Sequence, residues 1–208
     1  MSQLTLYGAR GWGSAITEVM LTLAGEEYDF VDVVGFDKPG SARETLQALN
    51  PQAQVPTLVL PDGSVMSESA AIALWLLDRH PHLAPRTFTP ERARFQRLMI
   101  WLVATVYPTF TYADYPERWV PGDGATFVEN ILQSRREMWL WLEQETETAW
   151  LAGEEMTLVD CWLVVMVTWR PGRNWFEVNT PTLATIAANV RTRPELRNIL
   201  ELNGLASS

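Results

Sequence analysis

Two short segments decide the fold of this chain: NPQAQVPTL at residues 50–58 and ESAAI at residues 68–72. The first segment stops a helical stretch at Asn50-Pro51 and then opens a β-strand at Val55-Pro56. A proline that opens a strand cannot donate a hydrogen bond to a neighbouring strand, so it belongs at an edge or a bend. The second segment begins a helix, and Pro61-Asp62-Gly63 between the two predicts a hairpin turn.

The chain before these segments alternates between strand and helix patterns. The first predicted helix has one apolar face, and Gly25 stands where a C-terminal cap is wanted; the face comprises Ile16, Val19, Met20, Leu23 and Ala24. Strands are predicted at residues 4–7, 28–34, 55–60 and 64–66, with helices at 16–24, 41–49 and 67–79. Strands separated by helices favour parallel crossovers, whereas the hairpin pair must be antiparallel. The order β-α-β-α-β-β-α therefore predicts a small mixed sheet of four strands with helices on its faces.

Strand patterns vanish after residue 80. A proline-punctuated linker at 81–89 separates a first domain, residues 1–80, from an all-helical second domain, residues 90–208. Helices are predicted there at 90–106, 127–147, 157–169, 182–191 and 194–202, with an aromatic-rich loop at 108–124. Thr157 and Asp160 match a capping box at the start of a buried helix, in which each side chain satisfies the other's amide. Cys161 lies in that apolar helix, which favours an inert core thiol.

Composition excludes several classes of protein. The net charge of −9 over 208 residues repels nucleic-acid backbones and anionic lipid. One cysteine allows neither an intrachain disulfide nor a multi-cysteine metal site, and His80 and His82 in a turn are poor metal ligands. No apolar run is long enough to span a bilayer, and the first residues lack the pattern of a leader peptide. We expect a cytoplasmic protein without a metal, and the ten tryptophans suit a ligand pocket or a subunit contact.

In order and spacing, the two opening segments resemble the core signature of glutathione transferases. The segment TLVD at residues 157–160 resembles the same family's helical half, so the resemblance covers nearly the whole chain. It implies a thioredoxin-like glutathione-binding domain followed by an all-α domain, and a homodimer. It also implies glutathione as the co-substrate.

The resemblance carries over to particular residues of the first domain. It implies that the bond before Pro56 is cis and that the backbone of Val55 pairs with the cysteinyl part of glutathione. A trans proline is the alternative, since only about 5–6% of X–Pro bonds are cis. At the helix start, Ser69 is expected to bind the γ-glutamyl carboxylate and Glu68 its ammonium group. The alternative is that Ser67 or Ser69 only caps the helix. Gln54 and Lys38 are weaker candidates for the glycyl end, and Lys38 is equally typical of a solvated loop.

The loop after the first strand should lower the pKa of the glutathione thiol. It contains no cysteine, so the mixed-disulfide chemistry of cysteine-bearing classes is not expected. The family's usual serine position falls near Gly11, and a cysteine position falls at Gly13. Tyr7 is one residue away from the tyrosine position, which turns its side chain to the other face of the strand. We therefore expect Ser14 to donate to the thiolate, with a plain N-cap role as the alternative.

An acceptor pocket in the helical domain would complete the site. Five aromatic residues are candidates for its lining, although such clusters are as often core: Trp12, Tyr107, Phe110, Tyr112 and Trp175. The resulting expectation is a detoxifying transferase that directs the glutathione thiolate at a hydrophobic electrophile. A glutathione-dependent peroxidase or isomerase and a non-catalytic binding protein are the alternatives. The replacement of the usual serine by Gly11 favours the non-catalytic one.

Overall fold

The computed structural model describes residues 3–206, and the chain forms two compact units. The first unit comprises Met1–Leu83 together with Arg191–Ser208, and the second comprises Ala84–Val190. The C-terminal segment therefore belongs to the first unit. This differs from the expected division at residues 80 and 90, in which the whole second half formed one domain.

The first unit has the predicted order of strands and helices. Its elements are β1 (Leu4–Gly8), α1 (Ser14–Ala24), β2 (Tyr28–Asp32), α2 (Ser41–Gln47), β3 (Thr57–Val59), β4 (Val65–Ser67), α3 (Ser69–Arg79) and η1 (Pro81–Leu83). The sheet order is β2-β1-β3-β4, with β1 and β2 parallel and the other two pairs antiparallel. The mixed four-stranded sheet is thus confirmed, together with its antiparallel hairpin.

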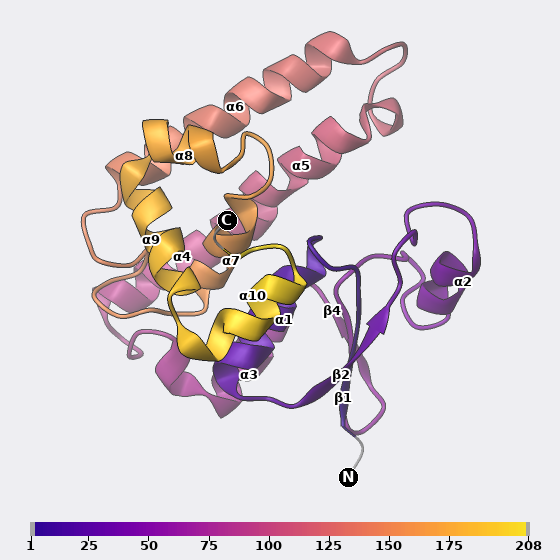
Figure 1. Ribbon diagram of the computed structural model, residues 1–208, viewed down its shortest axis with the longest axis horizontal. Coiled ribbons are helices and arrows are strands. Elements are labelled where there is room, and N and C mark those ends of the chain that lie inside the picture. Colours follow the sequence, from indigo (N-terminus) through magenta and orange to yellow (C-terminus); the bar gives the residue numbers. More distant parts are fainter. Residues whose placement is uncertain (1–2, 207–208) are drawn as a thin grey trace. The chain divides into compact units, whose positions relative to one another are not determined.

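Helix α1 is the centre of the first unit. Eight of its residues are buried, from Ser14 to Leu21, because the helix packs against α3 and against the C-terminal helix α10 (Arg197–Leu202). Figure 1 shows these three helices together on one side of the sheet and α2 on the other. Gly25 ends α1 in the left-handed conformation, at φ 71°, as its position predicted.

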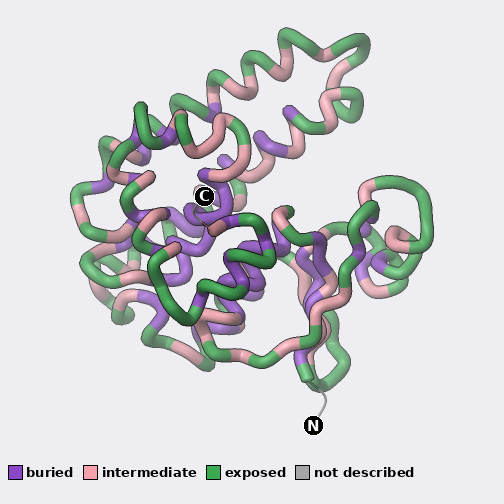
Figure 2. Tube along the Cα trace, viewed as in Figure 1, coloured by how far each residue is buried: buried purple, intermediate pink, exposed green. Residues whose placement is uncertain are grey.

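The C-terminal segment packs on α1 through two short elements. The 3-10 helix η4 (Pro194–Leu196) and α10 both contact α1. Leu196, Ile199, Leu200 and Leu205 are buried, whereas the outer face of α10 is exposed, as Figure 2 shows in green. Burial of these apolar side chains explains why the segment belongs to the first unit although it is distant in sequence.

The regular elements of the second unit are all helices in the described residues, with one isolated β-bridge between Trp150 and Gly153. Its elements are α4 (Pro90–Trp101), the π-helical segment η2 (Leu102–Val106), α5 (Tyr107–Asp114), η3 (Pro116–Arg118), α6 (Ala125–Gln144), α7 (Val159–Met166), α8 (Arg173–Asn179) and α9 (Pro181–Arg191). With the first unit, this gives a thioredoxin-like domain and a helical domain, the fold class that was expected. Helix α8 was not predicted from the sequence.

The loop predicted from Pro108 is wrong in its first part, because residues Tyr107–Asp114 form α5. The amide of Tyr107 donates to the carbonyl of Leu102, five residues earlier, so a π-turn links α4 to α5. Pro108 then occupies the first turn of the new helix, where its missing N–H is not required. The proline therefore begins a helix here, where a break was expected.

The Thr157–Asp160 motif forms one half of the predicted capping box. The Asp160 carboxylate accepts the Thr157 amide at 2.8 Å, but the Thr157 hydroxyl donates to the same carboxylate and caps no amide. The second Asp160 oxygen instead accepts the Leu151 amide at 3.0 Å. Asp160 thus ties the preceding loop to the start of α7, and Cys161 beside it is fully buried, as expected.

Candidate functional site

Four segments of the first unit meet at one end of the sheet. Tyr7 of β1 lies opposite Thr57 of β3, and Thr57 lies opposite Ser67 of β4. The end of parallel β2 joins them, because Gly8 lies beside Asp32. The loop after β1, the residues before β3, the start of α3 and the loop after β2 therefore leave the sheet at the same end. Nearly every residue expected to bind glutathione lies in one of these segments.

Val55 presents the backbone for an added strand. The Val55-Pro56 bond is cis, as the sequence resemblance implied. The ladder between β3 and β4 ends at Thr57 and Ser67, so Val55 and Ser69 lie two residues beyond its last pair, on adjoining chains. Within residues 3–206, neither the amide nor the carbonyl of Val55 has a hydrogen-bond partner. A backbone donor and acceptor without partners among these residues suit an extended peptide.

Two buried polar side chains hold the turn that precedes Val55. The Thr57 hydroxyl donates to the Gln54 carbonyl at 2.8 Å, and the Asn50 side-chain amide donates to both groups. Asn50 also accepts the Gln52 amide at 3.1 Å. Neither Asn50 nor Thr57 was singled out from the sequence as part of the site. In the sequence, these two residues are recognisable only as polar residues on either side of a strand start. Their burial in the structure shows that they support the site.

The start of α3 has the features of an anion site. Helix α3 has 11 residues, and the amides of its first turn point out of the helix. Glu68 precedes it at φ 67° and ψ 111°, a conformation that non-glycine residues rarely adopt. The N-cap position is Glu68, whose side chain makes no capping bond, so neither Ser67 nor Ser69 occupies that position. Ser69 is half-buried at the first helical position, and Glu68 is exposed.

Ser14 has a different environment from the one expected. Its side chain is fully buried, and its hydroxyl donates to the Ala9 carbonyl and accepts the Ala9 amide, both at 2.9 Å. A hydroxyl has one proton, and in this arrangement Ala9 holds it. The structure therefore gives no support to Ser14 as a donor to a thiolate. It is not the N-cap either, because that position is Gly13, which makes no side-chain bond.

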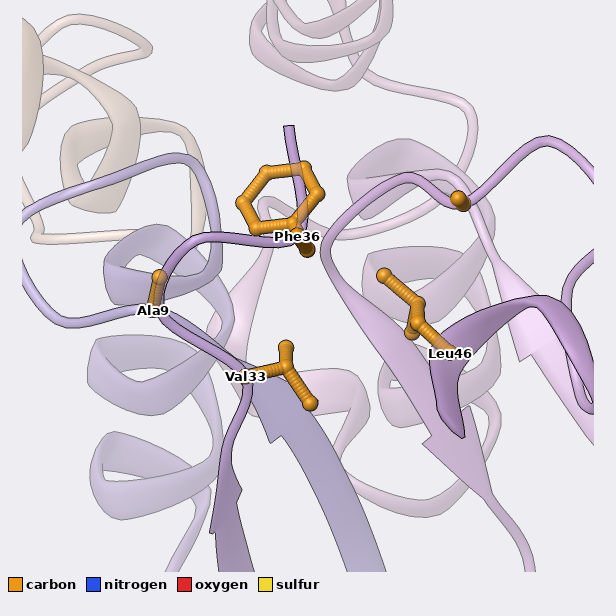
Figure 3. Close-up of a cluster of buried hydrophobic side chains, with 5 residues drawn as sticks. Ala9, Val33, Phe36 and Leu46 are labelled. Atoms are coloured by element: carbon orange, nitrogen blue, oxygen red, sulfur yellow. The ribbon is translucent and has the colours of Figure 1, made fainter. Parts of the chain in front are cut away.

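The loop after β1 also packs against residues on the α2 side of the sheet. Figure 3 shows Ala9, Val33, Phe36 and Leu46 in a buried cluster that joins this loop, the loop after β2, and α2. Tyr7 packs on the same cluster, on the strand face opposite that of the buried Leu6.

The remaining polar candidates of the first unit are exposed. Lys38 lies in the loop after β2, and Gln54 lies directly before Val55 at the same end of the sheet. Trp12 in the loop after β1 is 38% exposed and meets Phe36 edge-on, with ring centroids 5.4 Å apart.

The four expected pocket aromatics of the second unit belong to three separate ring groups. Tyr107 and Phe110 contact each other and Trp169, whereas Tyr112 pairs with Trp119, and Trp175 pairs with Phe176. Phe110 is only 7% exposed and lies under the guanidinium of the buried Arg135, at 3.8 Å. Phe110 is thus part of the core, while Tyr107, Tyr112 and Trp175 are partly exposed.

A buried polar network behind the loop was also missed from the sequence. Asn203, near the C-terminus, contacts both the Gly11 amide and the carboxylate of Glu18. Burial raises the pKa of Glu18, which is 1% exposed. The sequence does contain one indication of this buried network, a glutamate in the middle of an otherwise apolar helix face.

Neither a metal centre nor a bilayer-spanning element is evident in the described part of the chain. Residues 3–206 hold no group of three or more His, Cys, Asp or Glu side chains that could bind a metal ion. No helix among them combines the length and the apolar character that crossing a membrane requires.

Known proteins share both the sequence and the fold of this chain. The family model for the N-terminal domain of glutathione S-transferase matches residues 14–79. The uncharacterized GST-like protein YncG of Escherichia coli K12 is 50% identical over 201 residues, covering 96% of this chain and 98% of the relative. Glutathione S-transferase GstA of Escherichia coli O157:H7 is 28% identical, covering 97% and 100%. A glutathione transferase homologue from Sulfitobacter, solved with bound glutathione, superposes with a TM-score of 0.82 at 21% identity, covering 97% and 98%.

Proposed function

Because this chain belongs to the glutathione S-transferase family, we propose that it binds glutathione at the sheet end beside Val55 and transfers it to a hydrophobic electrophile. The observation that carries the proposal is the Val55 backbone, whose amide and carbonyl have no partner within residues 3–206. One residue of an extended peptide satisfies both groups, and the cysteinyl residue of glutathione is that residue in our proposal. The glutathione bound to the Sulfitobacter homologue supports this choice of ligand.

The two ends of the tripeptide have complementary partners. The γ-glutamyl carboxylate meets the first turn of α3, where the Ser69 hydroxyl and the helix dipole favour negative charge. The exposed carboxylate of Glu68 lies beside it and suits the ammonium group. The glycyl carboxylate faces Gln54 and Lys38, whose exposed side chains have room to reach it.

In this proposal, backbone amides stabilise the glutathione thiolate. The amides of Gly13 and Ser14, at the start of α1, have no hydrogen-bond partner within the described residues, whereas the Ser14 hydroxyl is occupied by Ala9. Two N–H groups at a helix N-terminus lower the pKa of a nearby thiol. The start of α1, and not the Ser14 side chain, thus stabilises the thiolate in this proposal.

The chemistry needs no further group from the protein. The thiol releases its proton to water, and the thiolate sulfur attacks an electrophilic carbon of the acceptor. A carbon–sulfur bond forms, and the bond to the leaving group breaks with its electron pair, as with chloride on an aromatic ring. Positioning and electrostatic stabilisation carry the catalysis. In the first unit, the partly exposed Trp12 is the aromatic that we propose for contact with the acceptor.

Calorimetry with glutathione tests the binding, and two acceptors test the reaction. We expect saturable binding at millimolar glutathione or below, and conjugation of a chlorinated dinitrobenzene followed by its absorbance. Reduction of an organic hydroperoxide instead would identify a peroxidase. Absence of glutathione binding would overturn the proposal.

A non-catalytic glutathione-binding protein is the second candidate, and one observation favours it. Gly11 stands near the usual serine position, has φ 77°, and donates its amide to Asn203, so no hydroxyl is available there. Binding of glutathione without turnover of either acceptor would identify this function.

The family further implies a cytoplasmic homodimer that removes hydrophobic electrophiles, and we include this in the proposal. Sedimentation equilibrium tests the assembly. A particle of twice the chain mass of 23.6 kDa is expected, and a monomer at micromolar concentration would contradict it.

A further inference from the structure

The C-terminal turn reaches the loop that follows β1 through one side chain. Asn203, which follows α10, is 6% exposed, and its Oδ1 accepts the Gly11 amide at 2.9 Å. Its Nδ2 donates to Glu18 Oε2 at 2.9 Å and to the Ile199 carbonyl at 3.0 Å. Three groups that are far apart in sequence thus converge on a single amide.

Only one orientation of this amide is possible. The Gly11 amide is a donor and requires an oxygen, whereas a carboxylate and a carbonyl require the NH₂ group. Turning the side chain over would set N–H against N–H and oxygen against oxygen. Glu18 therefore determines which atom of Asn203 faces the loop.

The backbone on both sides holds the contact rigidly. Gly204 has φ 67°, and the amides of Gly204 and Leu205 donate to the carbonyls of Glu201 and Leu200, which closes the helix end. On the other side, Gly11 has φ 77°, a conformation that a residue with a side chain rarely adopts. The contact thus joins a closed helix end to a loop residue whose positive φ requires a glycine.

The charge within the network is buried. Glu18 is 1% exposed on α1, and its other oxygen accepts the Tyr28 hydroxyl at 3.4 Å. Arg10 and Asp32 are the charged groups that act on it from the loop after β1 and from β2. A buried carboxylate needs strong donors, and Asn203 is the nearer of its two hydrogen-bond donors.

We propose that Asn203 is a positioning residue of the glutathione site, which fixes Gly11 so that the amides of Gly13 and Ser14 meet the thiolate. The inference rests on the proposed function. Gly11 is two residues from Gly13, and the Trp12 amide between them bonds to the Ala9 carbonyl. The Gly11 amide is held from the side of the C-terminus by Asn203. Release of that anchor lets the loop move and weakens both the binding and the ionisation of the thiol.

Exchanging the donor and the acceptor between residues 203 and 18 tests the proposal while both side chains keep their size. Asn203→Asp keeps an acceptor for Gly11 but removes the donor to the Ile199 carbonyl and sets a second carboxylate against Glu18, so the two carboxylates repel. Adding Glu18→Gln restores a donor–acceptor pair with its direction reversed. Asn198→Ala is the matched control, because Asn198 is exposed on the same helix.

Three readouts apply: the glutathione dissociation constant, the ultraviolet absorbance of the bound thiolate against pH, and hydrogen exchange of the peptide containing residues 9–13. For Asn203→Asp we expect binding about tenfold weaker, of the size of one lost hydrogen bond. The thiolate titration moves to higher pH and exchange of the loop peptide is faster. The double variant returns all three toward wild type, and Asn198→Ala changes none.

Wild-type binding and titration in folded Asn203→Asp would overturn the proposal, as would a folded double variant that is no better than the single one. Should Asn203→Asp fail to fold, the double variant decides, because restored folding together with restored titration supports the pairing. If wild-type protein does not bind glutathione at all, the proposed function fails. Loop exchange then still reports whether Asn203 holds Gly11.

Discussion

The hydroxyl of Ser14 and the backbone of Ala9 form a closed pair of hydrogen bonds, in which the hydroxyl both donates and accepts at 2.9 Å. This pair ties the first residue of α1 to the chain directly after β1. Both partners are fully buried, so water cannot replace either bond. The serine that the sequence offered for catalysis is thus a structural link between a strand and a helix.

Ser14→Ala is expected to lower stability and to leave the thiol unaffected. The substitution orphans the buried amide of Ala9, whereas the Ala9 carbonyl keeps the Trp12 amide. An orphaned buried amide costs about 1–3 kcal/mol of unfolding free energy. Urea unfolding measures the loss, with Ser41→Ala at the exposed start of α2 as control. A bound-glutathione thiol whose pKa rises in Ser14→Ala would return the catalytic role to the hydroxyl.

Gly8→Ala is expected to destabilise the protein through direct overlap. An added Cβ would lie 2.5 Å from Ser14 Oγ, 2.6 Å from Ser14 Cβ and 2.9 Å from the Phe30 ring. The Ser14 contacts involve a short side chain that cannot turn away, so the strand or the helix must shift. Overpacking of this kind costs about 1–3 kcal/mol. Thermal unfolding measures it, and an unchanged midpoint would show that β1 and α1 separate easily.

Ser69→Ala is expected to weaken glutathione binding without changing the fold. The hydroxyl lost is the one we assign to the γ-glutamyl carboxylate, and a hydrogen bond to a charged group contributes about 1.5–3 kcal/mol. Calorimetry measures the dissociation constant, with Ser67→Ala at the end of β4 as control. Ser69→Thr keeps a hydroxyl and should retain most of the affinity. Equal affinity in Ser69→Ala and wild type would remove this contact from the site.

The stability of the second unit is expected to fall as pH rises from about 4 to 6. Burial raises the pKa of Asp160 from 3.8 to about 6, against the lowering effect of hydrogen bonds from Thr157 and Leu151. The folded state therefore holds a proton that the unfolded chain has already released. A raised pKa contributes stability that is full below pH 3.8 and lost above about 6. The raised pKa of Asp160 corresponds to a loss of about 3 kcal/mol in the free energy of unfolding across this pH range.

Comparison with Asp160→Asn isolates this group. The variant is less stable at every pH, because its NH₂ group faces an amide donor, but it lacks the titration. The stability difference between wild type and variant should therefore shrink as pH rises through that window. A difference that grows with pH would mean that the hydrogen bonds to Asp160 outweigh its burial.

Much of the first unit followed from local patterns in the sequence. Apolar spacing predicted α1, Gly25 predicted its end, and the turn at Pro61-Asp62-Gly63 predicted the antiparallel hairpin. Such features depend on neighbours within a few residues, so the sequence alone contains them. The segment at residues 50–58 also carried the resemblance that predicted the cis bond before Pro56.

Contacts between distant residues were decided only by the tertiary structure. Nothing near Asn203 in the sequence indicates that its side chain accepts the Gly11 amide, 192 residues away. The boundary at residue 191 and the helix that begins at Tyr107 likewise depend on which surfaces pack and where a π-turn fits. A sequence specifies which side chains are able to donate, accept or be buried. Which of them are used depends on where the folded chain brings their partners, because hydrogen bonds act only at contact distance.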